Sequence, residues 1–451
     1  MVYRLSIRLG IAPKGVAGAA PPSPQYKSWL GNGTAGSHSS YGTAGGITVY
    51  GPWGGPNYTR SGGSPGQTTE AAAQTVMRIA GVLADMSHWV SQNFRPNGNV
   101  VWRTRVNGAD GNQIATMPPG SFNGGQSFTD TTHSDAVAEG DYVGMSITFA
   151  PEAGDDHIVS PSASLSLTTT DVQAQQIAAF SIPGITKGNT SNGYFSLGSG
   201  PSNTTSGTGY TARGIYNQIA ATTASLQVYF SASDYTGGTG TVKSHIWTAA
   251  GVAADGNQVV IWPTSGQAPA FREDTTHSDT LAQGDRHSCH HAAAGGSLSS
   301  IVVNTASMRF VYDAPGYSQM VTAGQTKAGQ GSAVWWPAVG TTDTGVDGTG
   351  STGVENTTIL SFGGVWDRLA VSCNANTLAA DGHMYGHYRR SGSFTQGNQA
   401  VTITAGGGAG TYIDTTHSDT LVAGDGIICR QDADLTSSAT VIGLTSRYAA
   451  A

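Results

Sequence analysis

The chain has 451 residues, of which 64 are glycine and only 11% are charged, and its formal net charge is −7. So few charged residues exclude a chain dominated by surface helices, because Glu and Lys normally solvate helix faces, and a hydrophobic share of 38% excludes a disordered chain. An acidic chain without a run of Lys or Arg also lacks the charge pattern of a nucleic-acid-binding protein. We therefore expect an all-β protein with turns rich in Gly, Ser and Thr, and no segment that enters a membrane.

The N-terminal segment predicts a β-strand. Residues 3–11 read YRLSIRLGI, with an apolar residue at every second position. A period of two is typical of a half-buried strand. Pro13 and Lys14 follow directly and interrupt the apolar core that an export signal requires, so we expect no such signal here.

A motif of fourteen residues occurs three times further along the chain. It reads FTDTTHSDAVAEGD at 128–141, REDTTHSDTLAQGD at 272–285 and YIDTTHSDTLVAGD at 412–425. The copies begin 144 and 140 residues apart. A spacing this long is the size of a domain, not of a solenoid unit.

The repeat extends to both sides of this motif. A Gly-Asn-Gln step lies upstream of each copy, at 111–113, 256–258 and 397–399. An apolar segment closes each repeat downstream, at 164–167, 307–312 and 441–448. We therefore predict three tandem homologous β-sandwich domains at 1–168, 169–312 and 313–451.

The front of each repeat differs from the other two. Residues 31–70, 186–212 and 322–358 are rich in Gly, Ser, Thr and Asn, a composition typical of long loops. The sequence thus predicts one scaffold that carries three different loop sets.

The motif residues have a structural and a metal-binding interpretation. Short polar side chains satisfy the backbone of turns, whereas His-x-Asp with a further Asp three residues earlier is a possible ligand set. Because the motif recurs in every domain, we interpret it as a turn that the fold requires and predict no metal. The residues assigned to this structural role are Asp130, His133, Asp135, Asp141, Asp274, His277, Asp279, Asp285, Asp414, His417, Asp419 and Asp425.

The second domain alone contains the string RHSCHH, at 286–291, which also resembles a metal cluster. On a strand, His287, Cys289 and His291 share one face. The position of Cys289 is Met or Cys in the other domains, which indicates a core position. We therefore expect these side chains to pack in the core, and three unpaired cysteines predict no disulfide framework.

Aromatic residues in the Gly-rich fronts are candidate contacts with a partner or a glycan. Such side chains stack sugars, fill a partner's pocket or anchor a loop on its scaffold, and all three interpretations stay open. The candidates are Tyr50, Trp53, Tyr58, Trp335 and Trp336.

Two resemblances follow from these motifs. The Gly-Asp turn before the penultimate strand and the final apolar strand resemble jelly rolls of the C1q/TNF-like kind, which implies three tandem jelly-roll domains. The string RVNG at 105–108, the Gly-Asn-Gln step and the F-x-D-T-T-H-S-D motif resemble β-rich virion proteins of tailed bacteriophages. Those include capsid decoration proteins, head spikes and tail or collar fibres.

The resemblance to virion proteins implies a structural component of a bacteriophage particle, either a capsid decoration protein or a head or tail appendage. We expect it in the virion, after assembly in the cytoplasm of the bacterial host. Its expected partners are other capsid or tail proteins and sister copies, in a trimer or in a pseudo-trimer of the three domains of one chain.

Two other classes of function stay in view. The first is a carbohydrate-binding adhesin that recognises host polysaccharide through the loop aromatics. The second is a polysaccharide-degrading enzyme, but the chain contains no nucleophile elbow, P-loop or HExxH motif and only five Glu. We therefore expect no enzyme, no catalytic residue and no cofactor.

Overall fold

A computed structural model describes most of the chain, at residues 26–35, 47–51, 70–151, 158–159, 162–187, 193–195, 197, 214–236, 239–294, 301–327, 334–338, 341–342, 357–432 and 439–451. The strand expected at 3–11 and most of the Gly-rich fronts lie outside these ranges. Within the described residues, no helix is long and apolar enough to cross a membrane.

The first domain consists of two antiparallel sheets. One contains β1, β10, β4 and β7 in this order, and the other contains β2, β8, β5 and β6; β3 pairs with β8, and β9 with β4. The bounds are β1 (Tyr26–Ala35), β2 (Ile47–Gly51), the 3-10 helix η1 (Glu70–Ala73), β3 (Thr75–Val76), β4 (Gly81–Asn93), β5 (Val100–Val106), β6 (Ala109–Met117), β7 (Phe122–Val137), β8 (Tyr142–Phe149), β9 (Ile158–Val159) and β10 (Ser162–Thr169).

The second domain repeats this arrangement. Its sheets have the orders β11-β19-β14-β17 and β12-β18-β15-β16, and β13 pairs with β18. The bounds are β11 (Ala174–Lys187), β12 (Gly193–Phe195), β13 (Ile215–Tyr216), β14 (Ala221–Ser233), β15 (Thr239–Trp247), β16 (Ala253–Ile261), β17 (Ala270–Leu281), β18 (Arg286–Ala294) and β19 (Ile301–Tyr312).

The third domain has the same strand order once more. Its sheets are β20-β30-β24-β27 and β21-β29-β25-β26, with β28 on β24, β23 on β29, and β22 in parallel with β1. The bounds are β20 (Tyr317–Lys327), β21 (Val334–Pro337), β22 (Thr341–Thr342), β23 (Thr358–Ile359), β24 (Gly364–Asn376), β25 (Gly382–Arg390), β26 (Ser393–Ile403), β27 (Gly410–Ile413), β28 (Ser418–Leu421), β29 (Gly426–Gln431) and β30 (Ala439–Ala450).

This strand order defines the fold class. In each domain, consecutive main strands alternate between the two sheets except for the fourth and fifth, which form a hairpin in one sheet. One sheet therefore holds the first, eighth, third and sixth strands, and the other holds the second, seventh, fourth and fifth. That alternation is the arrangement of a jelly roll. Side chains from both sheets of each domain form one buried cluster between them. The prediction of an all-β chain with jelly-roll domains in tandem is confirmed.

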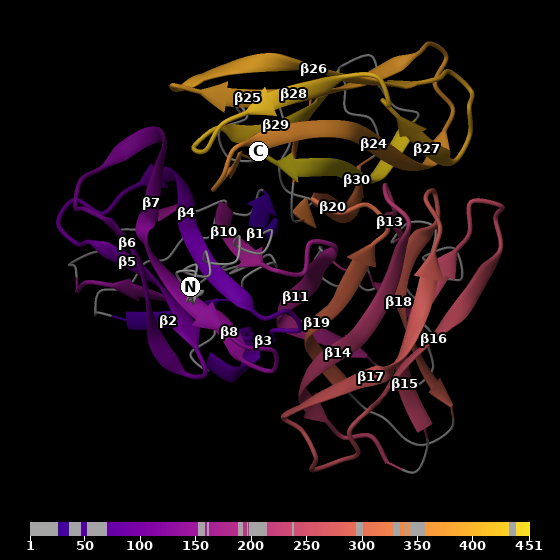
Figure 1. Cartoon of the computed structure of the whole chain (residues 1–451), viewed down its shortest axis with the longest axis horizontal. Coiled ribbons are helices and arrows are strands. Elements are labelled where there is room, and N and C mark those ends of the chain that lie inside the picture. The colour runs from indigo at the N-terminus through magenta and orange to yellow at the C-terminus, as the bar shows by residue number, and fades with distance from the viewer. Residues whose placement is uncertain are drawn as a thin grey trace, which may run out of the picture.

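The three domains surround a common centre (Figure 1). Their contacts are cyclic: β3 of the first domain contacts β19 of the second, β13 of the second contacts β30 of the third, and β23 of the third contacts β10 of the first. The short strand that precedes the third main strand of each domain (β3, β13 or β23) thus packs on the eighth main strand of the next domain. One chain therefore builds a closed ring with approximate threefold symmetry.

Two glutamines make equivalent contacts in this ring. The Oε1 atom of Gln176 on β11 accepts the backbone N–H of Arg78 at 2.8 Å, and its Nε2 donates to the Val76 carbonyl at 2.7 Å. Gln319 on β20 repeats both bonds, at 3.1 and 2.7 Å, with the corresponding backbone of the second domain. Both side chains are buried, so each satisfies backbone groups that the domain interface removes from water.

The three cysteines are core residues. Cys289 on β18 and Cys429 on β29 occupy the same place in their domains, and Cys373 lies on β24. All three are buried free thiols, and burial raises their pKa values, that of Cys373 to about 12. The prediction that these are packing positions is confirmed by exposed fractions of 0 to 1%.

Candidate functional site

The repeated motif forms a bulge within a strand pair. In the first domain, Met86 pairs with Asp130 and Ala84 pairs with Ser134, so residues 131–133 lie opposite the single residue Asp85. Asp85 has a positive φ of 54°, and its counterparts Ser225 and Arg368 have φ values of 53° and 54°. The strands β7 and β17 run through the motif, because the bulge absorbs the extra residues. In the third domain β27 ends at Ile413 and β28 begins at Ser418.

The first Asp of the motif holds this bulge together. The Oδ1 atom of Asp130 accepts the backbone N–H groups of Thr132 and His133 at 3.0 and 3.1 Å, and Oδ2 accepts that of Ile114 at 2.7 Å. Nδ1 of His133 lies 2.9 Å from Oδ2. Burial raises the pKa of Asp130, but these hydrogen bonds outweigh burial and hold it well below its usual range.

The corresponding aspartates of the other domains have the same environment. Asp274 accepts the backbone N–H of Val259 at 2.8 Å, and Asp414 accepts that of Ala400 at 2.9 Å. Here too burial raises the pKa of each aspartate. The hydrogen bonds from backbone, Thr and His lower it by more than burial raises it, so the pKa is about 2 in both. The exposed His277 and His417 lie beside these carboxylates in the same way as His133.

The second Asp of the motif explains the Gly-Asn-Gln step. Asp135 accepts the backbone N–H of Asn112 at 2.6 Å, and a Cβ atom on Gly111 would lie 2.7 Å from its Oδ2. Asp279 and Asp419 accept the equivalent N–H groups at 2.6 and 2.8 Å. Any side chain at the glycine would collide with the carboxylate in all three domains, because the next backbone N–H must approach it closely.

The last Asp closes the Gly-Asp turn. Asp141 accepts the backbone N–H of Ala138 at 2.7 Å, and Asp285 and Asp425 accept the equivalent groups at 2.8 and 2.9 Å. All twelve motif residues therefore lie in three equivalent networks of turn contacts. Within the described part of the chain, a group of three possible metal ligands does not form around any of these motifs.

The candidate aromatic residues have different outcomes. Trp53 and Tyr58 lie outside the described residues, whereas Tyr50 and Trp335 are half-buried on β2 and β21. Trp336 was a candidate contact with a partner or a glycan, but it anchors its strand instead, so the contact interpretation is wrong for this residue. Its side chain is 0% exposed in the core of the third domain, where Nε1 donates to Gln431 at 3.1 Å. Adjacent residues of a strand face opposite ways, so only one of the two tryptophans can face outward.

Tyr50 and Trp335 occupy equivalent positions, and the second domain has Tyr194 there. Each of these three aromatic residues lies on the second strand of its domain, directly before a buried residue. Across the strand pair, each faces the residue that follows Met145, Cys289 or Cys429. The sequence interpretation missed Tyr194, although the register of GYF at 193–195 against β18 makes it the counterpart of the other two. Each domain thus presents one aromatic ring on the outer face of the same sheet.

Basic side chains flank these three rings. Arg105 lies 5.7 Å from the centroid of the Tyr50 ring, and Arg430 lies 5.7 Å from that of Trp335. In the second domain, the His290 ring stacks on Tyr194 with centroids 4.6 Å apart and planes inclined by 15°. The scaffold is therefore common to the domains, while the chemistry of this outer face differs.

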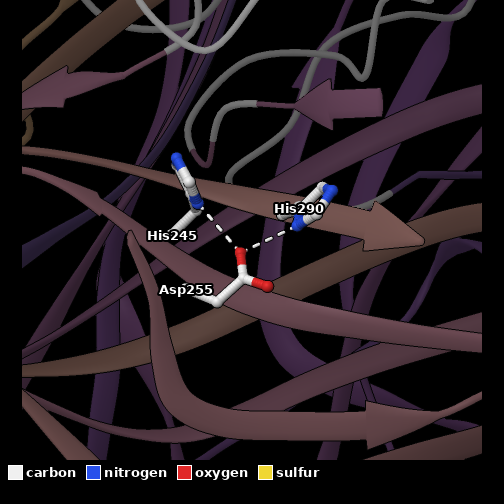
Figure 2. A group of neighbouring side chains, drawn as sticks. All are labelled: His245, Asp255 and His290. Carbon is white, nitrogen blue, oxygen red and sulfur yellow. Dashed lines mark hydrogen bonds and ion pairs between the residues drawn. The ribbon is translucent and has the colours of Figure 1, made fainter. Parts of the chain in front are cut away.

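The second domain gathers two histidines and an aspartate (Figure 2), and Tyr194 lies against both histidine rings. Nδ1 of His245 on β15 and Nδ1 of His290 on β18 lie 2.9 and 2.8 Å from the same oxygen, Oδ1 of Asp255 on β16. Nζ of Lys243 lies 3.2 Å from the other oxygen, Oδ2. The sequence interpretation considered the opposite face of β18; as predicted, His287, Cys289 and His291 are buried there.

Neither a protein-family model nor a curated protein matches this chain. Among solved structures, it is similar to one described as "The Triple Jelly Roll Fold and Turret Assembly in an Archaeal Virus", with 11% identity over 84% of this chain and 82% of that chain. The TM-score is 0.16, and a likeness this weak carries no conclusion about function.

Proposed function

We propose that this chain is a structural component of a bacteriophage particle, a capsid decoration protein or a head or tail appendage. The observation that carries the proposal is the closed ring of three jelly rolls, in which equivalent strands (β3, β13 and β23) recur in the contacts between neighbouring domains. A preassembled ring gives a particle one rigid three-lobed unit with three chemically different outer faces. The motif strings that resemble tailed-phage virion proteins support the same assignment.

The proposal makes the chain an assembly protein and not an enzyme. The acidic residues of the repeat accept hydrogen bonds from the backbone, and pKa values near 2 for Asp274 and Asp414 suit them poorly to general acid–base chemistry near neutral pH. Its partners are then capsid or tail proteins, or sister copies. Its location is the virion, after assembly in the host cytoplasm, and it binds neither nucleic acid nor membrane.

A second candidate function is carbohydrate recognition at the host surface. The observation that favours it is the matched set of half-buried rings, Tyr50, Tyr194 and Trp335, each with polar or basic neighbours on an outer face. Rings with one exposed side and adjacent hydrogen-bonding groups are suited to stack sugars. An adhesin and a decoration protein would use this same face for different partners.

The double variant Tyr50→Ala with Trp335→Ala separates these functions. Both residues lie on edge strands, so the jelly rolls should stay folded by circular dichroism. We expect incorporation into particles to fall by at least about tenfold, because buried aromatic contacts dominate protein interfaces. Phe94→Ala, at a ring that is 40% exposed elsewhere on the first domain, is the matched control. Normal incorporation together with lost binding on a glycan array would replace the assembly role with the adhesin.

A further inference from the structure

The His245, Asp255 and His290 side chains have the composition of a metal site. Two imidazole nitrogens and one carboxylate oxygen point toward one another from three neighbouring strands (Figure 2), and these ligand atoms all lie within 4.8 Å of one another. The His side chains are 8 and 10% exposed and that of Asp255 is 29% exposed. Zn²⁺ and related divalent ions are bound by this combination of imidazole and carboxylate ligands.

The separations between these atoms suit a shared ion. Two donors at about 2.1 Å from a metal, at angles from 90° to tetrahedral, lie about 3.0–3.4 Å apart. The two Nδ1–Oδ1 separations of 2.9 and 2.8 Å are close to that range. The ligand nitrogens of the two histidines lie within 4.8 Å of each other, and rotations of the side chains that bring them closer would replace the two hydrogen bonds by three bonds to one metal ion.

The sister domains place different groups at the equivalent positions. In the first domain, Arg105 pairs with Asp110 where the second has His245 and Asp255. In the third, His387 pairs with Gln396, and Arg430 stands where the second has His290. The other two domains thus contain a guanidinium at this face and an incomplete ligand set, and only the second combines two imidazoles with a carboxylate.

Neighbouring side chains orient these ligand groups. Lys243 binds Oδ2 of Asp255, which leaves Oδ1 directed at the two rings. Tyr194 stacks on His290 and lies 4.9 Å, centroid to centroid, from His245, so it holds both rings in place.

We propose that the second domain binds one divalent transition-metal ion of the Zn²⁺ class through Nδ1 of His245, Nδ1 of His290 and Oδ1 of Asp255. With three protein ligands, at least one coordination position faces away from the sheet and stays open to water or to a ligand. This site is independent of the assembly role, since neither function requires the other.

Titration of the untagged full chain with Zn²⁺ in a calorimeter tests the site. We expect one ion per chain and a rise in the melting temperature on saturation. Asp255→Gln introduces the residue that the third domain has at the equivalent position, and His290→Ser introduces the residue that the first domain has there. The strands should therefore accommodate both changes. Each should weaken Zn²⁺ binding by at least about tenfold, since even groups that only orient a ligand contribute 10- to 100-fold. His383→Gln, on a half-buried histidine of β25, is the matched control and should bind like the unmodified chain.

The alternative outcomes are distinct. Absence of saturable binding up to millimolar Zn²⁺, or binding unchanged in both variants, would overturn the proposal. Loss of binding in His277→Gln with full binding in His290→Ser would move the metal to the repeated motif and also overturn it. If Asp255→Gln fails to fold by circular dichroism, His290→Ser decides, because domain one has Ser146 at that place.

Discussion

Replacement of Asp274 by alanine should lower the free energy of unfolding of the second domain by about 3 kcal/mol. The carboxylate accepts the backbone N–H groups of Val259, Thr276 and His277 at 2.8, 3.0 and 3.2 Å. Alanine has no side-chain acceptor, so all three N–H groups lose this hydrogen bond in the variant. A buried donor without a partner costs about 1–3 kcal/mol, and water compensates the two donors near the surface in part. Denaturant unfolding followed by circular dichroism measures the change.

A matched control separates this role from a general effect of charge. Asp313→Ala removes an exposed carboxylate that follows β19, and it should change the free energy of unfolding by less than about 0.5 kcal/mol. If Asp274→Ala unfolded like this control and instead lost a bound metal or partner, the structural interpretation of the motif would be wrong.

The same network predicts how stability depends on pH. The pKa of Asp274 is about 2 in the folded chain, below its ordinary value near 3.9 in an unfolded chain. A lowered pKa stabilises the folded state above about pH 4, and the stabilisation is lost as the pH falls toward 2. Asp274→Ala should therefore show a smaller loss of stability between pH 4 and pH 2 than the unmodified chain.

The second large effect is expected at the interfaces between domains. Gln176→Met with Gln319→Met preserves the size of both side chains but removes two donors and two acceptors from buried backbone partners. We expect a loss of about 2 kcal/mol at each interface and separation of one calorimetric transition into several. Gln283→Met, on an exposed residue of a Gly-Asp turn, is the control. An unchanged calorimetric profile would mean that these glutamines do not couple the domains.

The repeat made the fold predictable because the same residues make the same contacts three times. Gly111, for example, is followed by an N–H that binds Asp135, and this pair recurs at 256–279 and 397–419. The spacing of such pairs along the chain reveals a domain-sized unit. Each pair joins the fifth and sixth main strands of its domain across the two sheets.

The interfaces and the outer faces were not predictable in this way. Gln176 and Gln319 carry no pattern in the sequence, since their partners are backbone groups of another domain. The histidine cluster unites residues 194, 245, 255 and 290, which only the register of four strands brings together. For Trp336, the period of two was the available signal: of two adjacent tryptophans on a strand, one had to face the core.

The position of this chain in an intact particle is the measurement that decides its role. Electron cryomicroscopy of purified particles, with mass spectrometry of the same sample, should detect the chain and show three-lobed densities of jelly-roll size attached to the capsid or the tail. Each set of lobes should fit one chain. Particles that lack the chain, with all of it left in the soluble fraction of the lysed host, would contradict a structural role in the virion.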